Sequence, residues 1–177
     1  MKLQNEIFVE QKIKDTFGED AKVEIQRERR VKVYVEPKKV FPMIAFLKAQ
    51  GFDHFVAISC VDWIKDDEFE LVYHMWSHSY KVHVMVKTRI PRKDPVIETV
   101  SPIFEHAETY ERDIHEFFGI DFPGNNKLRP FILEDWDGPP PMRKDFDTRR
   151  FSEIFYGQKD IEKELFTIVP QKFRGGK

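Results

Sequence analysis

The sequence predicts an α+β fold, with a single two-layer domain followed by a long irregular docking arm. Apolar residues recur at helical spacing near the N-terminus and again after residue 110, alternate with polar residues in most segments between, and lose any period after residue 120. The expected order α-β-β-α-β-β-β-α-α groups strands between helices, which indicates one sheet covered by one helical layer. We place the domain at residues 1–120, and the arm with its tail at residues 121–177.

The first third of the chain predicts two helices around a pair of strands. Residues 5–17 carry apolar side chains at roughly helical intervals, and Gly18 suits the position just past a helix end. Alternating apolar and polar residues predict strands around residues 23–25 and 31–35, joined by a hairpin turn. Residues 38–50 are expected to form the second helix.

Three further strands and a short helix follow. Residues 55–63 are apolar at both parities, which predicts a central strand covered on both faces. Residues 69–75 and 80–86 alternate, so each strand is expected to bury one face. Ser101-Pro102 suits the start of a short helix that would end near Ala107.

Residues 110–146 differ in character from the rest of the chain. Thr109 can cap a helix with one apolar stripe, and Gly119 is expected to close it. The residues after it fit no period but include large apolar side chains, which argues against a solvated tail. Trp136 and Arg143 are residue types that are favoured at binding hot spots. We therefore predict a docking arm, and the alternative is an arm that packs on its own domain.

Composition limits the classes of function. The chain has 177 residues, a net charge of −2 and one cysteine, so an iron–sulfur cluster with four thiolate ligands and an internal disulfide are both excluded. No apolar run approaches the roughly 20 residues of a membrane span. Nothing near the N-terminus matches a signal peptide, so we expect a cytoplasmic protein. Abundant Lys and Glu with few amides are typical of hyperthermophile proteins, and the alternative is an ordinary charged surface of a mesophile protein.

Candidate chemistry is sparse. His74 and His78 would lie about 13 Å apart on a strand, whereas His78 and His83 could approach across a hairpin, but without a carboxylate or thiol at ligand spacing. Cys60 lies in an apolar strand and is expected to behave as a small buried hydrophobe. The chain has no glycine-rich phosphate loop and no unopposed basic cluster, so we expect no nucleic-acid partner. A stand-alone metal- or thiol-dependent enzyme is kept as the alternative class.

The stretch from residue 111 to 145 resembles the signature of the 30 kDa subunit family of complex I. This family includes the NADH–quinone oxidoreductase C subunit and its counterparts in membrane-bound [NiFe] hydrogenases. The matching positions are Glu111-Arg112-Asp113, Phe118-Gly119-Ile120, Phe122, Gly124, Leu128-Arg129, Asp135-Trp136, Gly138 and Arg143-Lys144-Asp145. The strand Ile58-Ser59-Cys60-Val61-Asp62-Trp63 also resembles the family's strand that ends in Asp.

Glu116 stands where the family has Asp. Three other departures from this pattern point to a hydrogenase-related or archaeal branch of the family. Asn125-Asn126 stands where the family has His-Pro. Pro130 replaces an Arg, and Pro141-Met142 replaces Pro-Leu. We favour an archaeal membrane-bound [NiFe] hydrogenase or a related ferredoxin-linked complex, and an NADH/quinone or sulfur-linked respiratory complex is the alternative.

The resemblance implies a non-catalytic scaffold subunit in the hydrophilic arm of an ion-translocating membrane-bound oxidoreductase, peripheral to the cytoplasmic side of the membrane. Its partners would be the large catalytic subunit, of the [NiFe] type or its quinone-site counterpart, and the small iron–sulfur subunit. No residue is assigned to catalysis, to a metal or to a cofactor. The residues expected to dock on partners are Glu111, Arg112, Phe122, Leu128, Arg129, Asp135, Trp136, Arg143, Lys144 and Asp145.

Overall fold

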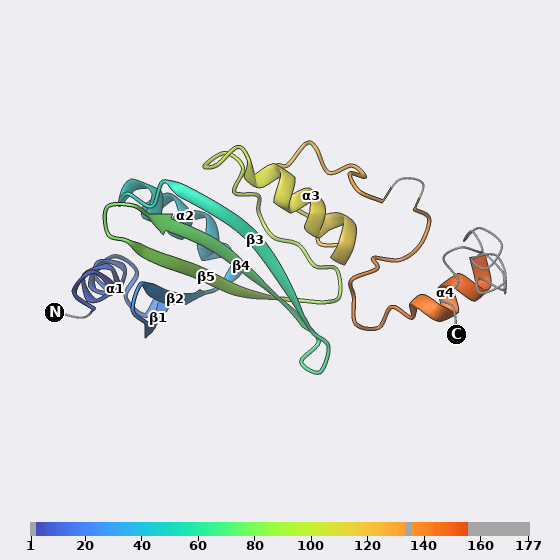
Figure 1. The fold of residues 1–177 in the computed structure, drawn as a ribbon, viewed down its shortest axis with the longest axis horizontal. Helices are drawn as coiled ribbons and strands as arrows, with labels where there is room; N and C mark the ends of the chain where they lie inside the picture. The colour runs from blue at the N-terminus through green and yellow to red at the C-terminus, as the bar shows by residue number, and fades with distance from the viewer. Residues whose placement is uncertain (1–2, 134–135, 156–177) are drawn as a thin grey trace, which may run out of the picture. The chain divides into compact units, whose positions relative to one another are not determined.

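The structure, a computed structural model, describes residues 3–133 and 136–155. The chain forms two compact units, Met1–Lys144 and Asp145–Lys177. The first unit confirms the predicted α+β class (Figure 1). Its helices and strands are α1 Gln4–Phe17, β1 Ala21–Arg27, β2 Arg30–Val35, α2 Val40–Ala49, β3 His54–Trp63, β4 Glu68–Ser77, β5 Val82–Pro91 and α3 Ala107–Phe118.

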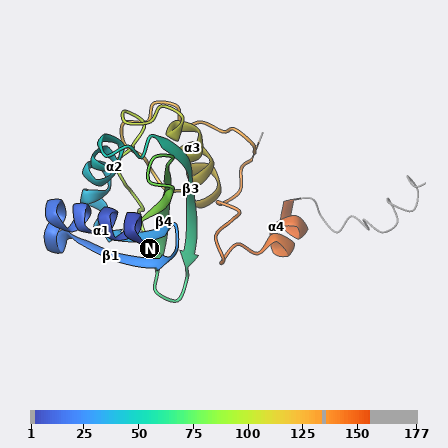
Figure 2. The same cartoon turned by 60° about the vertical axis from the view of Figure 1, so that its left-hand side comes forward.

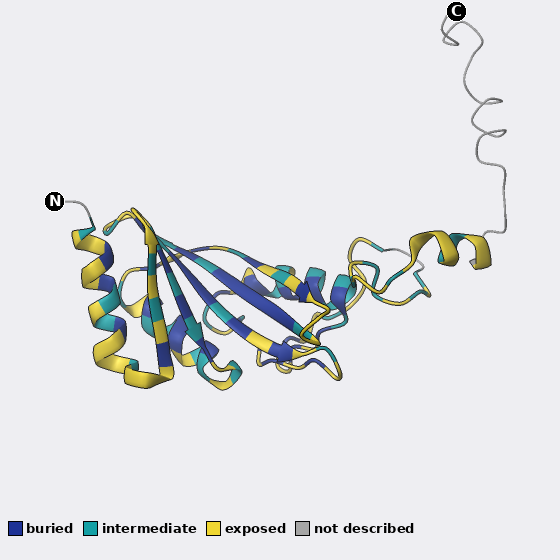
Figure 3. Ribbon diagram, turned by 90° about the horizontal axis from the view of Figure 1, so that it is seen from below, coloured by how far each residue is buried: buried dark blue, intermediate teal, exposed yellow. Residues whose placement is uncertain are grey.

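One five-stranded sheet organises the first unit, in the order β1-β2-β5-β4-β3. The β2–β5 pair is parallel and the other neighbours are antiparallel. Figure 2 shows α1, α2 and α3 on the same side of the sheet, so the domain has two layers. The described residues of this unit leave the opposite sheet face open, and buried and exposed residues alternate along most strands (Figure 3).

The core lies between the helices and the covered sheet face. In α2 the buried residues Val40, Ile44 and Leu47 follow the spacing of one helical face. They meet the apolar side of the central strands, where Leu71 and Val84 are fully buried. Burying such side chains stabilises the fold by roughly 1.5–3 kcal/mol each.

The prediction that residues 55–63 form a central strand is wrong, because β3 is an edge strand. A bulge between Phe55 and Ala57 shifts its register against β4. Beyond the bulge, Ile58 points to the core whereas Val61 and Trp63 are exposed. Apolar residues at both parities normally mark a strand covered twice, but the described part of this unit covers only one face of β3.

The short helix expected between Ser101 and Ala107 is also absent, since the structure has turns there. The backbone N–H of Ser101 donates to Thr99 Oγ1, and the two hydroxyl oxygens lie 2.9 Å apart. The Ser101 hydroxyl is therefore engaged with Thr99 and does not cap a helix. Helix α3 begins at Ala107 with His106, not Thr109, at the N-cap position.

In the second unit, α4 spans Thr148–Phe155, a helix that the sequence analysis did not predict. Asp147 Oδ1 accepts a hydrogen bond from the backbone N–H of Arg150 and so caps the helix. The ring centroids of Phe146 and Phe151 lie 5.4 Å apart. Across both described ranges, no helix combines the length and apolar character needed to cross a bilayer.

The open sheet face holds a histidine pair that the sequence analysis did not foresee. His74 Nδ1 lies 3.3 Å from His83 Nε2, and the two rings stack at 5.3 Å between centroids. Ser59 Oγ lies 3.0 Å from the other His74 nitrogen. Partial burial lowers the pKa of His74 from its ordinary value of 6.5. Burial, helped by His74 and Arg30, lowers the pKa of His83 to about 4.

We predict that this pair makes the fold less stable as the pH falls from about 6.5 towards 4. A histidine whose pKa is lowered by folding binds its proton more readily in the unfolded chain, so acid favours unfolding. The pair is half exposed, which weakens the effect, and we expect a loss of about 1–2 kcal/mol in the free energy of unfolding. Urea unfolding at pH 7 and pH 5 measures it, because His74→Gln/His83→Gln should lose less stability than the wild type. His54→Gln is the control, because His54 lies on the same face of the sheet but outside the pair. Equal losses of stability in the wild type and the double variant would contradict the prediction.

Candidate docking site

The buried carboxylate of Glu111 is the centre of the candidate site. Its side chain is 0% exposed within α3. Thr99 Oγ1 donates to Oε2 at 2.5 Å, the Val100 backbone N–H donates to Oε1 at 2.9 Å, and Asn125 Nδ2 donates to Oε2 at 2.9 Å. One side chain therefore joins α3, the connector after β5 and the start of the arm.

The buried environment of Glu111 disfavours the charged form of its carboxyl group. Burial raises the pKa of this carboxyl, and the donors from Thr99, Val100 and Asn125 partly oppose that rise. Asn125 is itself buried and stands where the resembled family pattern has His. Its amide also donates to the Glu108 carbonyl oxygen at 3.3 Å. Asn125, which departs from the family pattern, is thus a buried and hydrogen-bonded part of the site.

The arm, residues 121–144, doubles back on α3 and then runs forward along it. Near the start of the helix, Asn125 contacts Glu108 and Glu111. One turn further on, the guanidinium of Arg112 faces the carbonyl oxygens of Arg129 and Pro130, each 3.4 Å from a donor nitrogen. The same guanidinium lies 4.5 Å from the centre of the Phe131 ring.

Glu116 lies one helical turn after Arg112 and accepts hydrogen bonds from the backbone N–H groups of three consecutive arm residues. Its Oε1 accepts from Phe131 at 3.2 Å and from Leu133 at 2.6 Å, while Oε2 accepts from Ile132 at 3.0 Å. Residues four apart share a helical face, so Arg112 and Glu116 both attach the arm to the same face of α3. The first binds its carbonyl groups and the second binds its amide groups.

A second attachment lies at the C-terminal end of α3. Arg143 Nε donates to the Phe118 carbonyl oxygen at 2.7 Å, and Met142 N donates to that of Phe117 at 3.1 Å. These are carbonyl groups that the end of a helix leaves without partners. The positive charge of Arg143 also suits the negative end of the helix dipole. The arm therefore supplies hydrogen-bond donors to the backbone carbonyl groups at the C-terminal end of α3.

Gly119 makes this attachment possible. It follows α3 in the left-handed conformation, with φ +70°, and an added Cβ would lie 2.9 Å from Pro140 Cγ and 3.0 Å from an Arg143 nitrogen. Glycine is needed here both for the backbone angle and for the close approach of the arm. The predicted closing role of Gly119 is confirmed, since its N–H bonds to the His115 carbonyl oxygen at 2.8 Å.

Asp62, at the end of β3, anchors the last residue of the arm. Its buried carboxylate accepts the backbone N–H of Lys144 at 2.8 Å and pairs with Arg92 at 2.9 Å. Asp62 belongs to the strand motif that resembles the family, but the sequence did not indicate its role. Thr99, Asn125 and Glu116 were missed for the same reason, because each bonds to residues distant in sequence.

The predicted docking residues divide into an inner and an outer set. Glu111 and Phe122 are 0% exposed and so enclosed by this chain, and Leu128 is half-buried against the core. Arg112 and Arg143 are half-buried and hold the arm from within. Trp136 is half-buried and donates to the Pro139 carbonyl oxygen at 3.1 Å. Arg129, Lys144 and Asp145 are exposed, and Asp135 lies outside the described residues.

The arm exposes three large apolar side chains among its polar residues. Phe131 is 49%, Ile132 55% and Met142 56% exposed, although their backbones are tied to α3. The arm up to Lys144 thus packs on its own domain through its backbone, as in the alternative weighed from the sequence. The side chains of Phe131, Ile132 and Met142 nevertheless remain about half exposed. We call Phe131, Ile132 and Met142 the apolar ridge.

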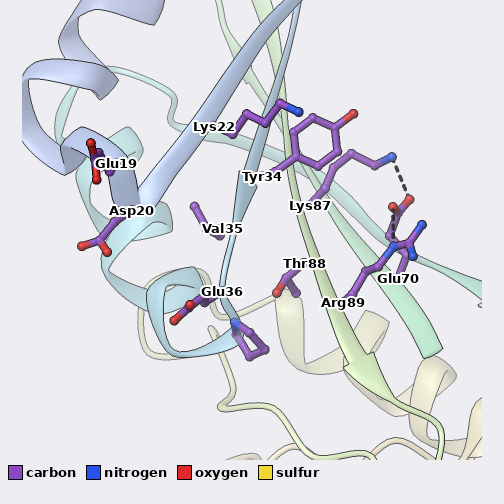
Figure 4. Close-up of a pocket in the computed structure, with 11 residues that line it drawn as sticks. Glu19, Asp20, Lys22, Tyr34, Val35, Glu36, Glu70, Lys87, Thr88 and Arg89 are labelled. Carbon is purple, nitrogen blue, oxygen red and sulfur yellow. Dashed lines mark ion pairs between the residues drawn. The ribbon is translucent and has the colours of Figure 1, made fainter. Parts of the chain in front are cut away.

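Other features offer less chemistry. A hollow of about 580 Å³ beside β2 and β5 is lined by several charged residues, and its Lys87–Glu70 ion pair, at 2.7 Å, is internal (Figure 4). Burial, with a contribution from Asp62, raises the pKa of Cys60 to about 12, so its thiol stays protonated. Among the described residues, no group of three or more His, Cys, Asp or Glu side chains is placed to hold a metal ion.

Comparison with known proteins identifies the family. The model of the respiratory-chain NADH dehydrogenase 30 kDa subunit matches residues 33–152, which include Asp62, α3 and the arm. The chain belongs to this family. It is therefore a subunit of the kind found in complex-I-like assemblies. The resemblance drawn from the motif is confirmed.

Individual relatives come from several kinds of complex. One subunit of the F420H2 dehydrogenase of Methanosarcina mazei is 38% identical, over 67% of this chain and 76% of the relative. A mitochondrial NADH-ubiquinone oxidoreductase 30.4 kDa subunit of Neurospora crassa is 32% identical over 81% of this chain, which spans only 53% of that relative. A chain in the structure of the membrane-bound sulfane sulfur reductase, an archaeal respiratory membrane complex, is 35% identical with a TM-score of 0.78, over 98% of this chain and 97% of the other.

Glu111→Ala should lower the free energy of unfolding by roughly 2–4 kcal/mol, because it leaves buried donors of Val100 and Asn125 without an acceptor. Chemical denaturation of the purified chain measures the change. Glu10→Ala is the matched control, since Glu10 forms an exposed helical ion pair with Lys14 at 2.7 Å and such pairs contribute about 0.5 kcal/mol or less. Similar effects for both variants would refute a special role for Glu111.

Gly119→Ala should release the arm from α3 because of the close approach to Pro140 and Arg143. Hydrogen exchange of the Met142 and Lys144 amides, whose bonds depend on that attachment, should accelerate by at least about tenfold, which corresponds to 1.4 kcal/mol. Gly18→Ala is the control, since Gly18 also has positive φ but no atom within 4 Å of an added Cβ. Unchanged exchange in Gly119→Ala would show that the glycine is not required for seating the arm.

Proposed function

We propose that the protein is a non-catalytic scaffold subunit of the hydrophilic arm of a complex-I-like, membrane-bound oxidoreductase. The observation that carries this proposal is the apolar ridge. Its backbone is fixed by Arg112, Glu116 and Arg143, while its side chains are about half exposed. A surface that is ordered before binding loses less entropy when a partner docks.

The ridge has the composition of an interface core. The ridge consists of large apolar side chains, and the exposed charges Arg129 and Lys144 lie near it in sequence. At protein interfaces, apolar contacts supply affinity and charges favour the correct partner. We propose that this surface contacts the large catalytic subunit beside the small iron–sulfur subunit. Residues 145–177 would extend the contact. Glu111 and Phe122 would act from inside by holding the arm in place.

The branch of the family is the finer part of the proposal. The sequence departures led us to favour a membrane-bound hydrogenase. The match to a chain of the sulfane sulfur reductase structure covers 98% of this chain, and on this support we now propose a sulfur-linked complex ahead of the hydrogenase. An F420H2-linked complex is the second candidate, on the strength of 38% identity to the Methanosarcina mazei protein. In each case we propose a peripheral position on the cytoplasmic side of the membrane.

A stand-alone thiol- or metal-dependent enzyme is less well supported. The pKa of Cys60, raised to about 12 by burial, disfavours the thiolate that a nucleophile or a metal ligand requires. The paired histidines His74 and His83 are bonded to each other. They have no third ligand among the described residues.

Co-purification of the whole complex from the native source, or from cells that express all its subunits, tests the proposal. Phe131→Ser/Ile132→Ser/Met142→Ser should reduce the recovery of the large subunit by at least about tenfold, because interface cores of this size supply several kcal/mol. The variant should unfold at the same temperature as the wild type, since the three side chains are exposed. Mass spectrometry of the recovered large subunit then identifies the branch.

Ile7→Ser is the matched control, because Ile7 is 54% exposed on α1, outside the arm, and it should leave recovery unchanged. Full recovery of the large subunit with the triple variant would overturn the docking role of the ridge.

A further inference from the structure

The open face of the sheet carries a second, unassigned hollow of about 790 Å³. It lies at the end of the strands where β3 begins, with His54 and Trp76 in its wall. Asp62, which anchors the arm, is eight residues along β3 from His54, or about 26 Å for an extended strand. The hollow therefore lies far from this end of the arm, and no arm residue lines it.

Three arginines of the β1–β2 hairpin, Arg27, Arg29 and Arg30, line this hollow. In the described part of the chain, none of them forms an ion pair with a carboxylate, and Glu28 is the only acidic residue that lines the hollow. Elsewhere on the same sheet face, Lys87 pairs with Glu70 at 2.7 Å and Lys32 pairs with Glu24 at 3.3 Å. The hollow thus has an excess of positive charge that the residues around it do not neutralise.

The hairpin is held in position before any ligand arrives. Arg29 has a left-handed backbone, with φ +62°, although it is not glycine. Its N–H donates to the buried carboxylate of Glu6 in α1 at 2.5 Å, and its carbonyl oxygen accepts the His83 N–H at 2.9 Å. A strained residue that its neighbours fix on both sides is a feature of functional surfaces.

The remaining wall of the hollow is apolar and aromatic. Val56 is 41% exposed, and the half-buried indole of Trp76 donates to His78 at 3.3 Å. Exposed apolar side chains continue along β3 to Val61 and Trp63. Arginine and tryptophan are enriched at protein interfaces. By contrast, a small-molecule site encloses most of its ligand, whereas this hollow opens onto a continuous mixed surface.

We propose that the hollow binds an acidic segment of another subunit of the same complex. Carboxylates of that segment would pair with Arg27, Arg29 and Arg30, and an apolar side chain next to them would pack on Trp76 and Val56. This inference rests on the proposed function, because it requires a multi-subunit assembly. It adds a second docking surface on the opposite face of the sheet from α3, so that this protein would hold two partners, or two parts of one partner, at a fixed separation.

Chemical modification of arginines by phenylglyoxal, mapped by mass spectrometry, tests the proposal on the native chain. The free chain, the free chain with inorganic phosphate, and the assembled complex are compared. Arg27, Arg29 and Arg30 should react in the first two samples and be protected at least about tenfold in the complex. Arg129 reports on the arm in the same experiment, because it is exposed beside the apolar ridge.

The outcomes separate the two proposals. A complex in which Arg129 is protected but the hairpin arginines still react would overturn this inference and leave the scaffold function standing. Failure of the complex to form, or of Arg129 to be protected, would count against the scaffold function. Protection of the hairpin arginines by phosphate alone would assign the hollow to a small anion and would also overturn the inference.

A charge-matched pair of variants gives a second measurement. Arg27→Gln/Arg29→Gln/Arg30→Gln should weaken assembly about tenfold and make it less sensitive to salt, because screened ion pairs are lost. Lys22→Gln/Lys65→Gln/Lys93→Gln removes the same charge from exposed positions outside the hollow and should have little effect. Equal effects of the two variants would show that net charge, not the hollow, matters.

Discussion

The hydrogen bonds from three donors to the buried carboxylate of Glu111 join helix α3 to the irregular segments packed against it. A carboxylate that is removed from water needs such bonds, because burying it without them costs free energy. Thr99, Val100 and Asn125 supply those bonds. The connector after β5 and the start of the arm are therefore held to the same turn of α3.

The rest of the arm follows from a second constraint, which is that its backbone has no sheet or helix to satisfy its polar groups. Arg112 binds its carbonyl groups, Glu116 binds its amide groups, and Arg143 returns to the exposed carbonyl end of α3. Because these bonds use the backbone of residues 129–133, the side chains of Phe131 and Ile132 are left to point outward. An irregular segment is thereby made into a fixed apolar surface.

The two sides of the domain differ in a way that suits a subunit of a larger assembly. The helical side carries the arm and its apolar ridge, whereas the open sheet face carries the arginines of the β1–β2 hairpin and exposed Val61 and Trp63 on β3. A solitary domain would be expected to cover or charge such an edge strand. In this chain His106 and Tyr110 bond to the carbonyl groups of Phe55 and Val56 on that edge. These two backbone groups are therefore satisfied, but the apolar side chains of Val61 and Trp63 remain exposed.

The sequence by itself determined α1, α2 and most of α3, the five strands, the α+β class, the family and the location of an irregular arm with large apolar side chains, because periodicity, caps and motifs are local properties of the chain. It did not indicate α4, and it predicted a helix between Ser101 and Ala107 that does not form. Only the tertiary structure decided that β3 lies at the sheet edge, that Glu111 and Phe122 turn inward, and that His74 meets His83. The physical reason is that strand order depends on pairings between distant segments, such as parallel β2 and β5. The polar groups of an irregular backbone likewise find partners, such as Glu116 and Asp62, that no local pattern identifies.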